Sequence, residues 1–365
     1  MTTRPPLPVL IVDDSAVARQ ALKAIVEADR GFRALLASDP YEAVEVMKRT
    51  VPAAILLDVN MPRMDGLTFL RKLMRQHPLP VLLCTDHPRK ALEGLELGAI
   101  EVIPKPRWED ASEQADWGDR LRESLHLAIA AAATGKGSGS DPLNTVPRLT
   151  SPPRQGADAI LPPLKLPLRG LPPDRDRVIV VGVSTGGVQA ISRLLADFPG
   201  DAPGIVVVQH MPGGFTAALA ERLDRDPTIP LEVAEARHGE PVRRGRALIV
   251  PGGDLHGVVR RVGLGYRVEL VDGPPVSRFR PSVDVLFRST AQAAGDRAVG
   301  VILTGMLDDG ARGLLEMSEA GGWTIAQDRA TSTVFGMNAE AIRLGAARQV
   351  LPLDRIAEAA VAGGY

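Results

Sequence analysis

Ser184 lies in a glycine-rich segment that is typical of a nucleophilic serine. The segment, residues 182–187, follows a predicted short buried strand at 177–181 and precedes an amphipathic run at 188–195. It matches G-x-S-x-G, in which a sharp turn between a strand and a helix exposes the serine hydroxyl. Glycine permits the bend, and N–H groups at the start of the helix stabilise negative charge. A phosphate-binding loop or a plain turn is the alternative interpretation.

A serine nucleophile needs a general base, and His210 is placed to serve as one. It follows the predicted strand at 205–208, so we expect it beside Ser184 at the carboxyl edge of a parallel sheet. A neutral histidine takes the serine proton and returns it to the leaving group. His238 and His256 lie in polar turns, and we interpret both as surface or structural residues.

Asp308 and Asp309 are the candidates for the acid that orients the histidine. They follow a predicted strand at 299–303 and open a predicted helix, so they reach the same sheet edge. One of them can hold the imidazole, while a helix N-cap is the alternative role for either. The order serine, histidine, aspartate differs from that of the α/β-hydrolases, which argues against a lipase-type esterase.

A second group of polar residues follows the predicted strands of the first half of the chain. Asp13 and Asp14 follow strand one, Asp58 strand three, Thr85 strand four and Lys105 strand five. Three carboxylates at one edge repel each other, and oxygen ligands of this kind suit Mg²⁺. A carboxylate can attack phosphorus, while a hydroxyl and an ammonium group hold the phosphoryl oxygens.

The elements that position these residues alternate between strand and helix in both halves. Five βα units in the first half predict a doubly wound parallel sheet. Their predicted strands are 9–12, 34–37, 53–57, 81–84 and 100–103, and their helices are 16–28, 41–49, 66–76, 90–97 and 113–131. A second α/β pattern starts at Val178, with a β-hairpin inserted at 258–271. Its other predicted strands are 205–208, 247–250, 299–303, 324–326 and 349–351, and its further helices are 216–223, 282–293, 309–319 and 339–344.

The stretch between the two patterns is predicted to be a linker. Residues 135–175 hold nine prolines and five glycines without sustained periodicity, so they cannot form a core. The glycine and serine residues at 135–140 predict flexibility, and the prolines predict stiffness. For 161–166 we favour a solvated tether over docking on a partner. The predicted organisation is therefore a domain at 1–130, a linker at 131–175 and a domain at 176–365.

The composition excludes several classes of protein. The formal net charge of the 365 residues is −1, which gives no support to nucleic-acid or membrane-surface binding. A DNA-binding regulator is disfavoured further because we find no helix-turn-helix pattern. Cys84 is the one cysteine, so no disulfide forms within the chain, which fits a reducing compartment. Without a signal peptide or an apolar stretch of about 20 residues, we expect a cytoplasmic protein with no membrane insertion.

The first half resembles the response-regulator receiver domains, over about residues 7–128. The segments that carry this resemblance are 11–15, 57–66 and 104–106. The resemblance implies a flavodoxin-like fold and a histidine kinase that phosphorylates Asp58. The metal ligands it implies for Mg²⁺ are Asp13, Asp14, Asp58 and the backbone of Asn60. It also implies that Thr85 and Lys105 sense the phosphoryl group. Val102 departs from the family, which usually has an aromatic residue there.

The second half resembles the chemotaxis protein-glutamate methylesterases, the CheB family. The segments 182–187, 209–216, 251–256, 280–287, 303–306 and 334–337 occur in the family's order. The resemblance implies Ser184 as nucleophile, His210 as base and Asp309, not Asp308, as the third member. It also implies an oxyanion contact from the Met306 backbone N–H and support from Thr185.

The same resemblance implies a substrate and an activity that is switched on by phosphorylation of the receiver domain. The substrate is a glutamate γ-methyl ester on the helical bundle of a methyl-accepting chemoreceptor, and glutamine deamidation at the same site is also implied. No cofactor is implied for the ester hydrolysis. Leu307 replaces a glycine that is common in the family, and it is strained if its φ is positive.

Two alternatives stay open from the residues alone. In the first, the protein is a phosphorylation-controlled adaptor with an inactive serine site, and the departure at Leu307 favours it. In the second, residues 182–187 form a phosphate loop of a nucleotide-binding module, but the lysine of G-x-x-x-x-G-K-[ST] is missing.

Overall fold

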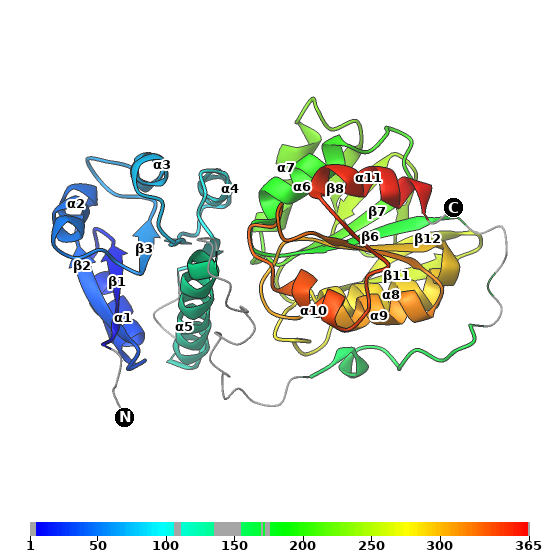
Figure 1. Ribbon diagram of the computed structural model, residues 1–365, viewed down its shortest axis with the longest axis horizontal. Coiled ribbons are helices and arrows are strands. Elements are labelled where there is room, and N and C mark those ends of the chain that lie inside the picture. Colours follow the sequence, from blue (N-terminus) through cyan, green and yellow to red (C-terminus); the bar gives the residue numbers. More distant parts are fainter. Residues whose placement is uncertain (1–4, 106–110, 135–154, 169–170, 172–175, 364–365) are drawn as a thin grey trace. The chain divides into compact units, whose positions relative to one another are not determined.

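The computed structural model describes residues 5–105, 111–134, 155–168, 171 and 176–363. The chain divides into two compact units, Met1–Leu149 and Thr150–Tyr365 (Figure 1). Each unit is an α/β structure with a parallel sheet, as the sequence predicts.

The first unit is a five-stranded parallel sheet in the order β2-β1-β3-β4-β5. This strand order is flavodoxin-like. The sheet grows to one side of β1 with β2 and to the other side with β3, so the topological switch point lies between β1 and β3. Helices α1 and α5 cover one face, and α2, α3 and α4 cover the other (Figure 1). The strands are β1 (Leu7–Val12), β2 (Phe32–Ala37), β3 (Ala54–Asp58), β4 (Val81–Cys84) and β5 (Glu101–Ile103), and the helices are α1 (Ala16–Glu27), α2 (Pro40–Arg49), α3 (Gly66–Gln76), α4 (Pro88–Glu96) and α5 (Ala111–Thr134).

The core of this unit lies between the sheet and the helices. Val9 and Ile11 of β1 are buried against Leu121 and Leu125 of α5. At the carboxyl end of β1, Ser15 begins α1 by accepting a hydrogen bond from the Ala18 N–H. The helix therefore starts directly after Asp13 and Asp14 and leaves them at the sheet edge.

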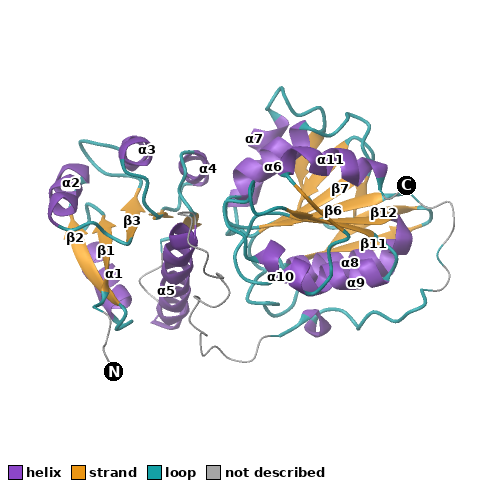
Figure 2. Cartoon of the chain, viewed as in Figure 1, coloured by secondary structure: helices purple, strands orange, loops and turns teal. Residues whose placement is uncertain are grey.

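The second unit contains a seven-stranded parallel sheet in the order β15-β14-β13-β6-β7-β10-β8. The chain builds outward from β6 on one side and then continues from β13 on the other, which is a topological switch point. Helices α6, α7 and α11 lie on one face of the sheet and α8, α9 and α10 on the other (Figure 2). The strands are β6 (Val178–Val183), β7 (Gly204–Gln209), β8 (Glu232–Glu235), β10 (Arg246–Ile249), β13 (Ala298–Ile302), β14 (Trp323–Gln327) and β15 (Gln349–Leu351), and the helices are α6 (Gly187–Ala196), α7 (Phe215–Asp224), α8 (Val283–Ala294), α9 (Ala311–Glu319), α10 (Met337–Arg343) and α11 (Leu353–Ala362).

The predicted β-hairpin is present and belongs to a separate antiparallel sheet. Strands β11 (His256–Val262) and β12 (Gly265–Val271) pair with each other, and β9 (Glu240–Val242) joins β12 as a third strand. Tyr266 and Val268 of β12 are buried in the main core of the unit. This small sheet leads the chain into the loop that precedes α8.

Part of the predicted linker packs on the second unit. Within 161–166, where a solvated tether is favoured, Leu161 is buried and Leu164 is half-buried, so the tether is wrong for these two residues, whereas the other four are exposed. Ala157 lies in a short 3₁₀ turn (Ala157–Ala159), and it is buried with Leu161 against Val258, Val276 and Val285. The apolar residues among the prolines therefore have a place to be buried, which the proline content alone did not indicate. The predicted flexible segment 135–140 lies outside the described residues.

Within the described ranges, no helix is both long enough and apolar enough to cross a membrane.

Candidate active site and candidate phosphorylation site

Ser184 and His210 lie side by side at the carboxyl edge of the larger sheet. They directly follow Val183 and Gln209, which are partners in the register of β6 and β7. The Gln209 side-chain amide donates to the Ser184 carbonyl at 3.0 Å, and the His210 N–H donates to the Val183 carbonyl at 3.1 Å. The strand pairing thus brings together two residues that are 26 positions apart in the sequence.

The turn that carries Ser184 requires its glycines. Gly186 has φ +77°, and a Cβ atom there would lie 2.5 Å from the Thr333 Cβ. A Cβ atom at Gly187 would lie 2.0 Å from the Gln209 Oε1. Any larger residue would therefore displace the turn from the next strand or from the loop at Thr333, and Ser184 would move with it.

His210 forms a buried hydrogen bond with Asp309. The His210 Nε2 lies 2.8 Å from the Asp309 Oδ2, with the histidine side chain 6% exposed and the carboxylate fully buried. The other ring nitrogen, Nδ1, is buried and has no hydrogen-bond partner among the described residues. When Nε2 carries the ring proton and donates it to the carboxylate, Nδ1 keeps a free electron pair.

The carboxylate of Asp309 also binds the first turn of helix α8. Its Oδ1 accepts from the Ser282 hydroxyl at 2.7 Å and from the Asp284 N–H at 3.1 Å. Its Oδ2 accepts from the Val283 N–H at 2.8 Å as well as from His210. N–H groups at a helix N-terminus favour a negative charge.

The alternative role of Asp308 or Asp309 as N-cap of the following helix is wrong. Gly310 is the N-cap of α9, and Asp309 instead satisfies the N-terminus of α8. Asp308 is half-buried and lines a pocket together with Asp284, Arg288 and Glu316. A serine directly before an apolar helix predicts an N-cap, but the Ser282 side chain makes no capping hydrogen bond and donates to Asp309 instead.

His256 accepts a hydrogen bond from the Ser282 N–H, and it is a buried structural residue, not a surface one. It is fully buried as the first residue of β11, so its prediction in a polar turn is wrong. Its Nε2 lies 3.0 Å from the Pro274 carbonyl, and its Nδ1 accepts from the Ser282 N–H at 3.2 Å. Burial lowers the pKa of the His256 side chain, so the ring stays neutral and keeps Nδ1 as an acceptor.

The loop after β13 passes directly against Ser184. A Cβ atom at Gly305 would lie 2.9 Å from the Ser184 Cβ, so only glycine permits this approach. The Thr304 hydroxyl donates to the Thr185 carbonyl at 2.9 Å, and this bond connects Thr185 to the loop after β13. No hydrogen bond within the described chain engages the Met306 N–H. Leu307 has φ +67°, so the strain expected at this departure is present.

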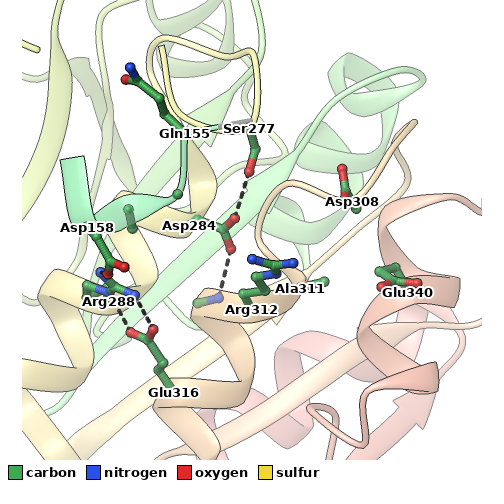
Figure 3. A pocket seen from close by; sticks show the side chains of 13 residues that line it. Gln155, Asp158, Ser277, Asp284, Arg288, Asp308, Ala311, Arg312, Glu316 and Glu340 are labelled. Atoms are coloured by element: carbon green, nitrogen blue, oxygen red, sulfur yellow. Dashed lines mark hydrogen bonds and ion pairs between the residues drawn. The ribbon is translucent and has the colours of Figure 1, made fainter. Parts of the chain in front are cut away.

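Asp284 is a second buried acid next to Asp309. Its Oδ1 accepts from the Gly313 N–H at 2.8 Å, and its Oδ2 lies 3.1 Å from the Ser277 hydroxyl (Figure 3). Burial and the charge of Asp309 raise the pKa of the Asp284 carboxyl to about 8. At neutral pH it is therefore protonated.

The first unit brings together a different set of polar residues at the end of β1 and β3. One carboxylate oxygen each from Asp13, Asp14 and Asp58 lies within 4.8 Å of the others. The Lys105 ammonium lies 3.2 Å from Asp13 Oδ2 and 3.0 Å from Asp58 Oδ2. Burial raises the pKa of the Asp58 carboxyl, while the Lys105 charge opposes that rise.

The remaining residues predicted for this site lie around the acidic cluster. Thr85 is buried directly after β4, and its hydroxyl accepts from the His87 N–H at 3.2 Å. The Asn60 side chain accepts from Lys90 at 2.6 Å, so its backbone is the part that remains for a metal ion. Val102 is buried in β5, at the position where the receiver resemblance implies an aromatic residue.

Known proteins are similar to this chain over nearly its whole length. Residues 179–360 match the CheB methylesterase family, and residues 9–114 match the response regulator receiver domain. Protein-glutamate methylesterase/protein-glutamine glutaminase 5 of Anaeromyxobacter dehalogenans is 51% identical over 364 residues, or 97% of this chain and 96% of that protein. The protein-glutamate methylesterase/protein-glutamine glutaminase of group 3 operon of Rhodopseudomonas palustris is 46% identical over 95% of this chain and 93% of its own length. The crystal structure of the Thermotoga maritima CheB methylesterase catalytic domain is 38% identical, with a TM-score of 0.49, over 51% of this chain and 98% of that chain.

Proposed function

The chain belongs to the CheB methylesterase family, and we propose that it hydrolyses glutamate γ-methyl esters on methyl-accepting chemoreceptors, in the cytoplasm, when its receiver domain is phosphorylated. The observation that carries the proposal is the buried pair of His210 and Asp309 at the sheet edge that also holds Ser184. The domains we propose are a receiver at 1–130, a linker at 131–175 and a catalytic domain at 176–365.

In the proposed reaction, Ser184 attacks the ester carbonyl and His210 takes its proton. Because Nε2 of His210 faces Asp309, Nδ1 is the atom that accepts the proton. The buried carboxylate of Asp309 stabilises the imidazolium that forms. His210 then protonates the departing methoxide, which leaves as methanol. Water hydrolyses the acyl-enzyme with the roles of His210 reversed, and this releases the glutamate.

The oxyanion of the tetrahedral intermediate needs a hydrogen-bond donor, and we assign this role to the Met306 N–H. It lies in the loop that passes against Ser184 and is not engaged by another group of the described chain. One such donor is worth about 10²- to 10³-fold in rate. The same chemistry on a glutamine side chain releases ammonia instead of methanol and constitutes the glutaminase activity. No cofactor takes part in either reaction as we propose it.

Control of the activity is assigned to Asp58. We infer that a chemotaxis histidine kinase donates its phosphoryl group to the Asp58 carboxylate, with Lys105 and Thr85 contacting the phosphoryl oxygens. Carboxylate oxygens that converge within 4.8 Å fit the preference of Mg²⁺ for oxygen ligands. Asp13, Asp14, Asp58 and the backbone of Asn60 would hold the ion, which neutralises phosphoryl charge when bound. Phosphorylation then shifts the conformational populations of the receiver.

The decisive experiment measures methanol release from a methylated chemoreceptor, with and without a phosphodonor and Mg²⁺. We expect release to rise with phosphorylation, to vanish in Ser184→Ala and to lose its stimulation in Asp58→Asn. A serine-reactive ester probe should label the unmodified protein and not Ser184→Ala. No methanol and no labelling from folded protein would contradict the hydrolase and favour an adaptor.

A further inference from the structure

The face of the His210 ring is covered by Phe279. The two rings are stacked, with 3.7 Å between their centroids and 3° between their planes. Phe279 lies in the loop between β12 and α8 and is half-buried. Nothing in its position along the chain indicates a contact with a residue 69 positions earlier.

We propose that Phe279 is a positioning residue that fixes the plane of the His210 imidazole. The inference rests on the proposed function, because His210 is the base of the proposed reaction. Nε2 lies close to the extension of the Cβ–Cγ bond, so its hydrogen bond to Asp309 restricts rotation of the ring about that bond only weakly. A parallel ring against the imidazole face removes this rotation and so fixes the direction of Nδ1. An aromatic face also favours the cationic ring that forms when His210 takes the serine proton.

The turn that carries Phe279 has an unusual backbone. The N–H of Val276 donates to the Phe279 carbonyl at 3.1 Å, and the N–H of Phe279 donates back to Val276 at 2.9 Å. Between them, Ser277 and Arg278 have φ +49° and +76°, the sign found in type I′ turns and favoured by glycine, asparagine and aspartate. Such a backbone persists only where the surroundings hold it.

The linker and helix α8 supply those surroundings. The Ser277 N–H donates to the Gln155 carbonyl of the linker at 3.0 Å, and the Ser277 side chain lies against Asp284 (Figure 3). Val276 is fully buried with Ala157 and Leu161. The turn is thus fixed by contacts that do not involve His210, so Phe279 can position His210 instead of following it.

The residue after Phe279 anchors the other side of the turn. Arg280 donates to the Gly253 carbonyl at 3.2 Å, to the Gly273 carbonyl at 2.9 Å and to Asp254 at 2.7 Å. Contacts on both sides of Phe279 therefore limit its movement, as a rigid support for the base requires.

The test compares Phe279→Leu with Phe279→Tyr in the full chain. Leucine keeps apolar volume without a planar ring, whereas tyrosine keeps the ring. We expect Phe279→Leu to lower kcat of methanol release by about 10- to 100-fold with little change in KM, and Phe279→Tyr to retain most of the activity. As a matched control, Phe198→Leu removes another buried ring of the same unit, and it should lower thermal stability without changing kcat.

A second readout keeps the inference testable if the proposed function fails. In NMR spectra, the His210 ring protons should show the upfield ring-current shift of a stacked neighbour, which Phe279→Leu removes and Phe279→Tyr keeps. Unchanged His210 shifts in Phe279→Leu would overturn the stacking, even in a chain that releases no methanol. A kcat within about twofold of the unmodified protein would overturn the positioning role, since a 1 Å displacement costs far more.

Discussion

The hydroxyl of Ser282 donates to the Oδ1 of Asp309 at 2.7 Å, directly at the N-cap position of helix α8. The carboxylate that holds His210 is therefore the same group that satisfies the first turn of this helix. Formation of the helix N-terminus and assembly of the candidate triad depend on one side chain, which gives the first two predictions.

Replacing Ser282 with alanine should weaken the support of Asp309 and therefore the positioning of the base. The change removes one of the donors to Asp309 and leaves the Val283 and Asp284 N–H groups in place. We expect a loss of about 1 kcal/mol in the free energy of unfolding and a moderate decrease of kcat. Ser289→Ala removes another buried hydroxyl of α8 and should destabilise the protein without lowering kcat. Equal kcat losses in the two variants would contradict the specific role of Ser282.

Asp309→Asn should nearly abolish turnover, whereas Asp308→Asn should not. An amide at position 309 removes the charge that stabilises the His210 imidazolium, and the comparable change in a serine protease lowers kcat about 10⁴-fold. Asp308 is half-buried outside the hydrogen bonds around His210. Steady-state methanol release from the two variants decides the assignment. A larger loss in Asp308→Asn would reverse it.

Asp284 should make the stability of the second unit depend on pH. Its pKa of about 8 in the folded chain lies above the ordinary value of 3.8, so the folded state holds one proton more between these values. The free energy of unfolding should therefore decrease as pH rises from about 4 to 8, with a slope of at most about 1.4 kcal/mol per pH unit.

Asp284→Asn provides the matched comparison for this pH dependence. The amide keeps an acceptor for Gly313 and presents a donor to Ser277 without any charge to bury. Denaturant unfolding at several pH values should give a flatter profile for this variant and a higher relative stability above pH 8. Parallel profiles for the two proteins would show that Asp284 does not titrate in this range.

Replacing Leu307 with glycine should disturb the protein less than replacing it with valine. The φ of +67° is readily adopted by glycine and is most costly for a β-branched residue. We expect Leu307→Gly to stay within about 1 kcal/mol of the unmodified stability, because relief of strain offsets the added freedom of the unfolded chain. Leu307→Val should lower both the thermal midpoint and kcat, since it displaces the neighbouring Met306 N–H. Better activity in Leu307→Val than in Leu307→Gly would contradict this account.

The sequence predicts best those elements whose apolar pattern is unambiguous. Strand β4 and helix α3 have the predicted bounds, because a short apolar run or a regular amphipathic pattern admits one solution. Strand β8 is absent from the prediction. It lies at the edge of the sheet and has glutamate at both ends, so no continuous apolar run marks it.

The candidate site was predictable where residues follow strands and not where loops meet. Ser184 and His210 follow neighbouring parallel strands, and the sheet rule brings them together. The contact of Asp309 with the start of α8 and the contact of Phe279 with His210 join loops far apart in the sequence. Such contacts depend on the packing of the whole unit, which no local pattern describes.

Ala157 and Leu161 belong to the linker by sequence but to the core of the second unit by packing. Recombination between members of the family would have to keep these linker residues together with the second unit. A chimaera joined at residue 176 would bring a foreign segment against Val258, Val276 and Val285, whereas one joined before residue 155 would carry the native covering along. The segment that must be exchanged as a unit is therefore longer than the segment that contains the catalytic residues.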